Sequence, residues 1–237
     1  MSNFKKNTAR NAYRRDVYLA YLIEGARRTK PDGYPIIEGW MVAKEIPQRL
    51  VQWDQRNTVT DPGHTGMSFY CIDPAPTPVL NHPDKYVDKL KQYQCVVGMD
   101  ASPYDNMPLV VQKSQIFLNL GITYYYGKQG IKIVPNVRVG TTDTLSSLDA
   151  YPHNHLIAIG TNGFTRSKTN RIIFKEQVTA IINTLEPSGI LVYGPASEYI
   201  FEEGIKKQIP IHQYDSYMMI KNREAAKKRK AGYTDER

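Results

Sequence analysis

Polar side chains follow one apolar, strand-like segment after another in this 237-residue sequence. In residues 131–140, IKIVPNVRVG, a β-branched run ends on Asn136 and Arg138, whose side chains are costly to bury without partners. If the strands are parallel, their carboxyl ends meet at one edge of the sheet, so the groups that follow them should converge. The residues that we expect at this edge include Asp73, Asp100, Asn136, Arg138, Asn162 and Tyr193, together with Ser102, Thr161, Tyr214 and Asp215.

These residue types fit a ligand that carries a phosphate, a sugar or a base. A guanidinium such as Arg138 pairs with anions, and the amides of Asn136 and Asn162 bond hydroxyls or a base edge. Asp73 and Asp100 are candidate catalytic residues, either as general bases or as oxygen ligands of a divalent cation such as Mg²⁺. The alternative is structural, because Asp and Asn after a strand also form turns and cap helices.

The elements that must position these residues alternate regularly from Gly66 onward. About six strands are expected, followed in turn by helices that include 109–120 and 168–186, where apolar residues recur at helical spacing. This alternation predicts an α/β fold of βα units with a mainly parallel sheet. We favour a small or incomplete α/β (TIM-like) barrel over an open doubly wound sheet, and in both the site lies at the carboxyl ends of the strands.

The strands and helices are expected to form one α/β domain, over residues 36–218, between two basic ends. Residues 10–28 have the spacing of an amphipathic helix, which together with the Pro- and Gly-containing segment after it forms an N-terminal helix and linker over 1–35. A short helix is also expected around 43–57. The C-terminal tail, 219–237, is expected to be a solvated helix or disordered.

The net charge of +8 is concentrated in the two ends of the chain. Residues 1–30 carry eight Lys or Arg against two acidic residues, residues 221–237 carry seven against three, and the remainder is slightly acidic. Basic ends favour contact with a polyanion such as DNA or RNA, although they also serve solubility. The candidate nucleic-acid-binding residues are Arg10, Arg14, Arg15, Lys227, Lys228, Arg229 and Lys230.

Several enzyme motifs are absent. The segment GITYYYGKQG has five residues rather than four before Gly127-Lys128, and Gln129 replaces the Ser or Thr of a phosphate-binding loop. Neither a nucleophile elbow nor the glycine fingerprint of a dinucleotide site occurs. His153 and His155 fit a loop better than a metal-binding pair, so no metal ligands are assigned.

The location expected from the sequence is the cytoplasm, that of the host cell if the protein is phage-encoded. No apolar run approaches the roughly 18–20 residues of a membrane span, so no membrane partner is expected. The N-terminus lacks the apolar core of a signal peptide. Cys71 and Cys95 lie in strand-like surroundings that favour buried thiols.

Four segments in order, GMDASPYDNMP, GIKIVPNVRVG, LIAIGTNG and ILVYGP, resemble the successive blocks of a family. It is domain-of-unknown-function family 4417, found in phages, prophages, plasmids and their bacterial hosts, and the likeness covers roughly residues 40–215. Asp100 matches the aspartate of its first block, and Tyr193-Gly194 its last strand end. Val139 stands where the family has an aromatic residue, which weakens a stacking role there. The resemblance implies a mobile-element origin and no particular chemistry.

Two functions of different class fit these observations. The first is a mobile-element protein that binds nucleic acid or a nucleotide or other phosphorylated ligand, with phosphoester chemistry at the strand-end pocket as one version. The second is a non-enzymatic binder that sequesters a host protein or a signalling nucleotide. A metabolic barrel enzyme is a weaker third, because only five histidines are available for acid–base chemistry near neutral pH.

Overall fold

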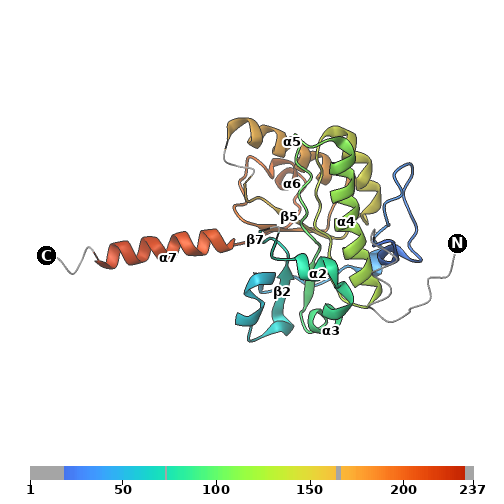
Figure 1. Ribbon diagram of the computed structural model, residues 1–237. Helices are drawn as coiled ribbons and strands as arrows, with labels where there is room; N and C mark the ends of the chain where they lie inside the picture. Colours follow the sequence, from blue (N-terminus) through green and yellow to red (C-terminus); the bar gives the residue numbers. More distant parts are fainter. Residues whose placement is uncertain (1–18, 73, 164–166, 233–237) are drawn as a thin grey trace.

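The computed structural model describes residues 19–72, 74–163 and 167–232 as an α/β protein with two parallel sheets (Figure 1). Of residues 230–232 only the backbone is described. One sheet has the order β1 (Arg49–Gln52), β2 (Thr65–Ser68), β3 (Cys95–Val97) and β4 (Ile133–Val134). The other has the order β5 (Leu156–Gly160), β6 (Gly189–Tyr193) and β7 (Ile211–Tyr214). The predicted α/β fold with a parallel sheet is therefore confirmed.

The two sheets meet at Pro135. The backbone N–H of Gly98 donates to the Val134 carbonyl, so β4 is paired with β3 up to this point. The next carbonyl, that of Pro135, accepts from Ala158 of β5, and Val137 donates back to Ala158. Since proline has no N–H to donate, it marks the place where the chain leaves one neighbour and turns to the other.

The far strands, β7 and β1, are linked by a side chain. The hydroxyl of Tyr214 at the end of β7 donates to the carbonyl of Pro47, just before β1, over 2.6 Å. No backbone ladder joins β7 to β1 within the described ranges. Closure into a barrel therefore stays a prediction.

The helices between the strands bury apolar faces against them. The apolar residues that predict the helix at 168–186 are all buried on α5 (Lys168–Leu185); they are Phe174, Val178, Ile181, Ile182 and Leu185. α4 (Leu109–Lys128) runs beyond its predicted end at 120, because Ile122, Tyr124 and Tyr126 are buried too. The remaining α-helices are α2 (Thr77–Asn81), α3 (Val87–Leu90), α6 (Glu202–Lys206) and α7 (Tyr217–Gly232). The 3-10 turns are Ala20–Ile23, Gly39–Met41, Trp53–Thr58, Pro62–His64, Pro83–Tyr86 and Thr142–Ala150.

Two sequence-based helix predictions are wrong in the described residues. The helix expected over 10–28 is, from residue 19 on, only a 3-10 turn, and Gly25 has a φ of +80°, which a helix cannot contain. Residues 10–18 lie outside the described residues. The helix expected around 43–57 is instead strand β1 followed by a 3-10 turn that begins at Trp53, since Pro47 disfavours a helix and Arg49–Gln52 pair in parallel with β2.

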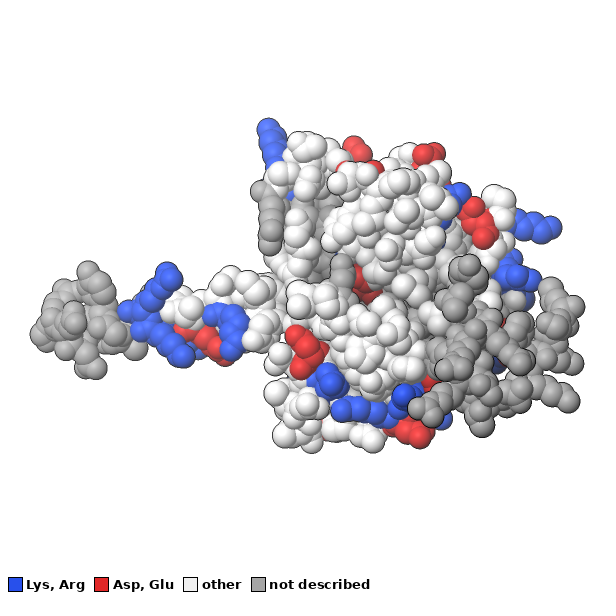
Figure 2. Space-filling view, in the orientation of Figure 1, with Lys and Arg blue, Asp and Glu red and all other residues white. Residues whose placement is uncertain are grey.

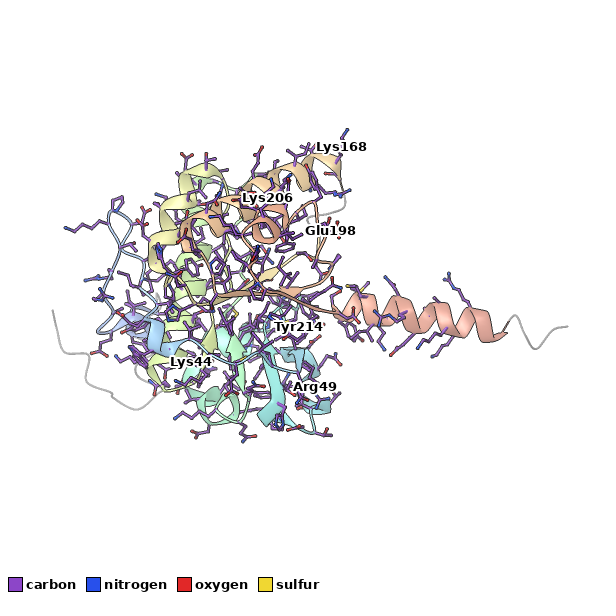
Figure 3. The ribbon with its side chains drawn as sticks, turned by 180° about the vertical axis from the view of Figure 1, so that it is seen from behind. Lys44, Arg49, Lys168, Glu198, Lys206 and Tyr214 are labelled. Atoms are coloured by element: carbon purple, nitrogen blue, oxygen red, sulfur yellow. The ribbon has the colours of Figure 1, made fainter. Side chains whose placement is uncertain are left out.

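The basic C-terminal segment forms a helix that projects from the body. Figure 1 shows α7 leaving the end of β7 and extending into space, and Figure 3 shows its side chains pointing outward all round, with Tyr214 near its base. This agrees with the solvated helix expected from the sequence. None of the helices in the described part of the chain is long and apolar enough to span a membrane.

A substitution at Gly98, just after β3, tests how closely the side chains and backbone pack where the two sheets meet. A Cβ at this position would lie 2.5 Å from Thr123 Oγ1 of α4 and 3.1 Å from the backbone N of Asn136. We expect Gly98→Ala to lower the free energy of unfolding by about 1–3 kcal/mol, measured by urea denaturation, because this packing cannot admit a methyl group without shifting. Gly63→Ala, whose Cβ meets only one atom at 3.8 Å, should change it by less than about 0.5 kcal/mol. Equal effects of the two changes would contradict the packing.

Candidate ligand-binding site

A cavity of about 900 Å³ lies at the carboxyl ends of the strands, within the range of small-molecule sites. Its lining residues come from the carboxyl ends of the seven strands of the described chain, or from the segments that follow them, and from α5. Those that carry the argument are Gln52, Tyr70, Asp100, Arg138, Gln177 and Tyr193. The cavity is therefore where the parallel arrangement predicts a site.

The floor of the cavity holds a buried ion pair. Asp100, after β3, accepts from Arg138, after β4, through two parallel bonds: Nε to Oδ1 at 2.6 Å and Nη2 to Oδ2 at 3.0 Å. The third guanidinium nitrogen, Nη1, donates to the Gly160 carbonyl of β5 at 3.3 Å. The side chain of Arg138 is only 8% exposed and that of Asp100 only 11%. Burial lowers the pKa of Arg138, but the charge and hydrogen bonds of Asp100 outweigh it, so the pKa lies above its usual value.

Asn136 ties this pair to the neighbouring strands. Its Nδ2 donates to Asp100 Oδ1 at 2.8 Å and to the Met99 carbonyl at 3.0 Å. Its Oδ1 accepts from the Tyr70 hydroxyl at 2.8 Å. Both ends of the amide are thus occupied, which explains how a buried asparagine is tolerated beyond the end of β4.

Two stacked tyrosines complete the floor. The rings of Tyr70, after β2, and Tyr193, at the end of β6, lie 4.9 Å apart at an angle of 9°. Burial, together with the charge of Asp100, raises the pKa of Tyr70 well above its usual value. Burial also raises the pKa of Tyr193 to about 12. The Tyr193 hydroxyl accepts from the backbone N–H of Tyr217, so this network reaches the first residue of α7.

Gly160 makes the close packing of the floor possible. A Cβ there would lie 2.7 Å from the Tyr70 ring and 3.0 Å from Arg138 Nη2. Any side chain at the end of β5 would therefore displace either the stacked ring or the guanidinium.

The charge of the cavity is negative. Asp54, Asp100 and Asp105 line it, whereas Arg138 is the only cationic side chain among its described lining residues. Figure 2 shows acidic atoms recessed near the centre of a mostly uncharged face, with basic and acidic atoms mixed around its rims and on α7. No group of three or more His, Cys, Asp or Glu within the described residues could hold a metal ion.

The structure brings together four of the residues predicted from the sequence. Asp100, Asn136, Arg138 and Tyr193 form the floor, and Asn162 is exposed at the wall. Lys227, Lys228 and Arg229 are exposed on α7, which also contains Lys230. Four further candidates lie outside the described residues: Asp73, Arg10, Arg14 and Arg15.

Sequence reasoning missed several residues of the site. Tyr70 precedes the expected Asp73 by three positions, and an aromatic residue at a strand end was the available signal. Gln52 was missed because its segment was taken for a helix. Gln177, Phe174 and Tyr217 lie on helices, where sequence alone does not separate a cavity wall from a solvated or packed face.

The ion pair is the first target for mutation. Arg138→Met or Asp100→Asn alone should cost about 3–5 kcal/mol of unfolding free energy, because each leaves a buried charge or donor without its partner. The double variant Asp100→Leu/Arg138→Met should cost less than the sum of Asp100→Leu and Arg138→Met. Additive costs in urea denaturation would show that the two side chains act independently.

The tyrosine floor predicts a loss of stability in alkali. The folded pKa of Tyr193 is about 12 and its usual value is 10.0, so above pH 10 the unfolded chain releases this proton more readily than the folded one. Stability is therefore intact below pH 10 and falls as pH rises towards 12, by about 3 kcal/mol for this group. Tyr193→Phe should flatten the decline, measured by urea denaturation at several pH values. An unchanged slope in that variant would contradict the role of this hydroxyl.

Comparison with known proteins places the chain among phage-related sequences. It is 24% identical over 152 residues to the Gene 1 protein of Mycobacterium phage L5, covering 63% of this chain and 66% of that protein. It is 21% identical over 152 residues to the Gene 1 protein of Mycobacterium phage D29, covering 63% of this chain and 56% of that protein. The chain thus spans less than two thirds of the length of either. No solved structure matches it.

A family model described as "Domain of unknown function (DUF4417)" matches residues 35–215. This range contains every strand that the structure describes and nearly all of the described cavity lining, and it stops just before α7. The resemblance seen in four sequence blocks is confirmed, and the chain belongs to this family.

Proposed function

We propose that the protein binds single-stranded nucleic acid, with a base in the strand-end cavity and the phosphate backbone along α7. The observation that carries this proposal is the continuity between the two surfaces. Tyr217 and Met218 line the cavity and are also the first residues of α7, whose following turns carry Lys221, Arg223 and the cluster Lys227–Arg229.

The charges of the two surfaces indicate which part of the ligand each of them binds. The guanidinium of Arg138 is held by Asp100 and the Gly160 carbonyl, and the other charged lining residues described are acidic, so the cavity disfavours a phosphate. Its aromatic lining, which includes Tyr104 and Phe174, suits the flat face of a base. Exposed lysines and arginines on α7 suit the phosphates that follow.

The geometry favours binding over catalysis. Both oxygens of Asp100 accept hydrogen bonds from Arg138, and Oδ1 also accepts one from Asn136. A carboxylate held in this way is poorly placed to take a proton from a substrate or to ligate a cation. The phosphoester version of the proposal would need Asp73, which lies outside the described residues.

The role of α7 is tested by the triple change Lys227→Gln, Lys228→Gln and Arg229→Gln. Binding of a fluorescent single-stranded oligonucleotide should weaken, and the slope of log affinity against log salt should become shallower by about 2, because each contact to a single strand contributes about 0.7. The control is Lys44→Gln, Lys85→Gln and Lys91→Gln, three exposed lysines of the body, of which Lys44 is labelled in Figure 3. Equal slopes in the two triple variants would remove α7 from the interface.

Sequestration of a free signalling nucleotide uses the same cavity without α7. It predicts that a mononucleotide binds equally well to the wild-type protein and to the α7 variant, and that an oligonucleotide gains nothing over it. Titration of both ligands into both proteins separates this alternative from the proposal.

A further inference from the structure

The hydrogen-bonding groups that the cavity offers define the kind of base it takes. Gln52, only 8% exposed, donates from Nε2 to the Tyr70 carbonyl at 2.8 Å. A carbonyl can only accept, so this bond fixes the orientation of the amide. The Gln52 Oε1 atom is left buried, with no donor among the described residues.

Gln177, from α5, repeats this arrangement in another part of the lining. Its Nε2 donates to the Gly140 carbonyl at 2.8 Å, which again fixes the amide and leaves Oε1 to accept. Gln52 lies at the end of β1 and Gln177 on α5, so two segments far apart in the sequence each place an amide in the same lining.

The stronger donors of the floor are already in use. All three guanidinium nitrogens of Arg138 have acceptors, and the Tyr70 hydroxyl donates to Asn136. The carboxylates of Asp54 and Asp105 add acceptors to the walls. Beside the hydroxyls and amides of Ser102, Tyr104, Asn162 and Asn170, the lining thus presents the oxygens of Gln177, Asp54 and Asp105 as acceptors, which a ligand with N–H groups can satisfy.

We propose, building on the function proposed above, that the cavity selects bases with an exocyclic amino group. An amino group brings two N–H donors to the acceptors of the lining, whereas a carbonyl in the same place faces oxygen atoms and leaves them without hydrogen-bond partners. Adenine and cytosine are thus preferred over hypoxanthine and uracil, which carry a carbonyl oxygen at the corresponding position. Gln177 is a specificity-determining residue, because its oxygen is one of these acceptors.

The experiment compares ligands of the same size that differ at this one group. Adenosine and inosine monophosphates, and cytidine and uridine monophosphates, are titrated calorimetrically into the full-length protein, as are the corresponding homo-oligonucleotides of equal length. We expect the amino-bearing member of each pair to bind about ten-fold tighter. Gln177→Met should reduce this ratio, and Gln115→Met on α4, outside the cavity lining, should preserve it.

The possible results distinguish a failure of the amino-group selection from a failure of the proposed nucleic-acid binding. Equal affinity within each pair for the wild-type protein overturns the amino-group selection, while the binding itself upholds the proposed function. A ratio that Gln177→Met leaves unchanged overturns the assignment of this residue. Absence of binding for every nucleotide and oligonucleotide overturns both proposals. Because the first comparison uses only the wild-type protein, it does not depend on how well a variant folds.

Discussion

The arrangement of the strand ends depends on the buried pair of Asp100 and Arg138. The two residues are contributed by the segments after β3 and β4, and the guanidinium also bonds the Gly160 carbonyl of β5, so one side chain ties three strand ends across the junction of the two sheets. A buried charge without such partners would be strongly destabilising. Gly160 provides the space that the pair and the Tyr70 ring need, and Asn136 joins them.

The same pair determines the electrostatics of the cavity. Asp100 neutralises the charge of Arg138, so the carboxylates of Asp54 and Asp105 leave the cavity with a negative charge. The protein as a whole nevertheless carries a net charge of +8. A cluster of basic residues lies on α7, which begins just beyond the residues matched by the family model. This combination of an acidic, aromatic cavity and a basic helix is the basis on which we propose a polyanionic ligand with uncharged bases.

The sequence predicted which side chains lie together at the strand ends better than it predicted the contacts they make. Asp100, Asn136, Arg138 and Tyr193 follow from the rule that parallel strands deliver their next residues to one edge. The sequence predicted that Arg138 pairs with the anion of a ligand. It could not show that Asp100 is the partner instead, because Asp100 lies 38 positions away and only the fold brings it near. Gln52 was missed for a different reason: β1 is short, and its pairing with β2 overrides a helical reading that Pro47 already weakened.

Ultraviolet crosslinking of a single-stranded oligonucleotide, followed by mass spectrometry of the joined peptides, shows whether a base enters the cavity above the ion pair. Such crosslinks form only where a base touches a side chain. The account predicts crosslinks to Tyr104, Phe174 or Tyr217, all in the cavity lining. Trp40, 61% exposed and outside the lining, is the internal reference. Crosslinks confined to Trp40 or to other residues outside the cavity would contradict the account.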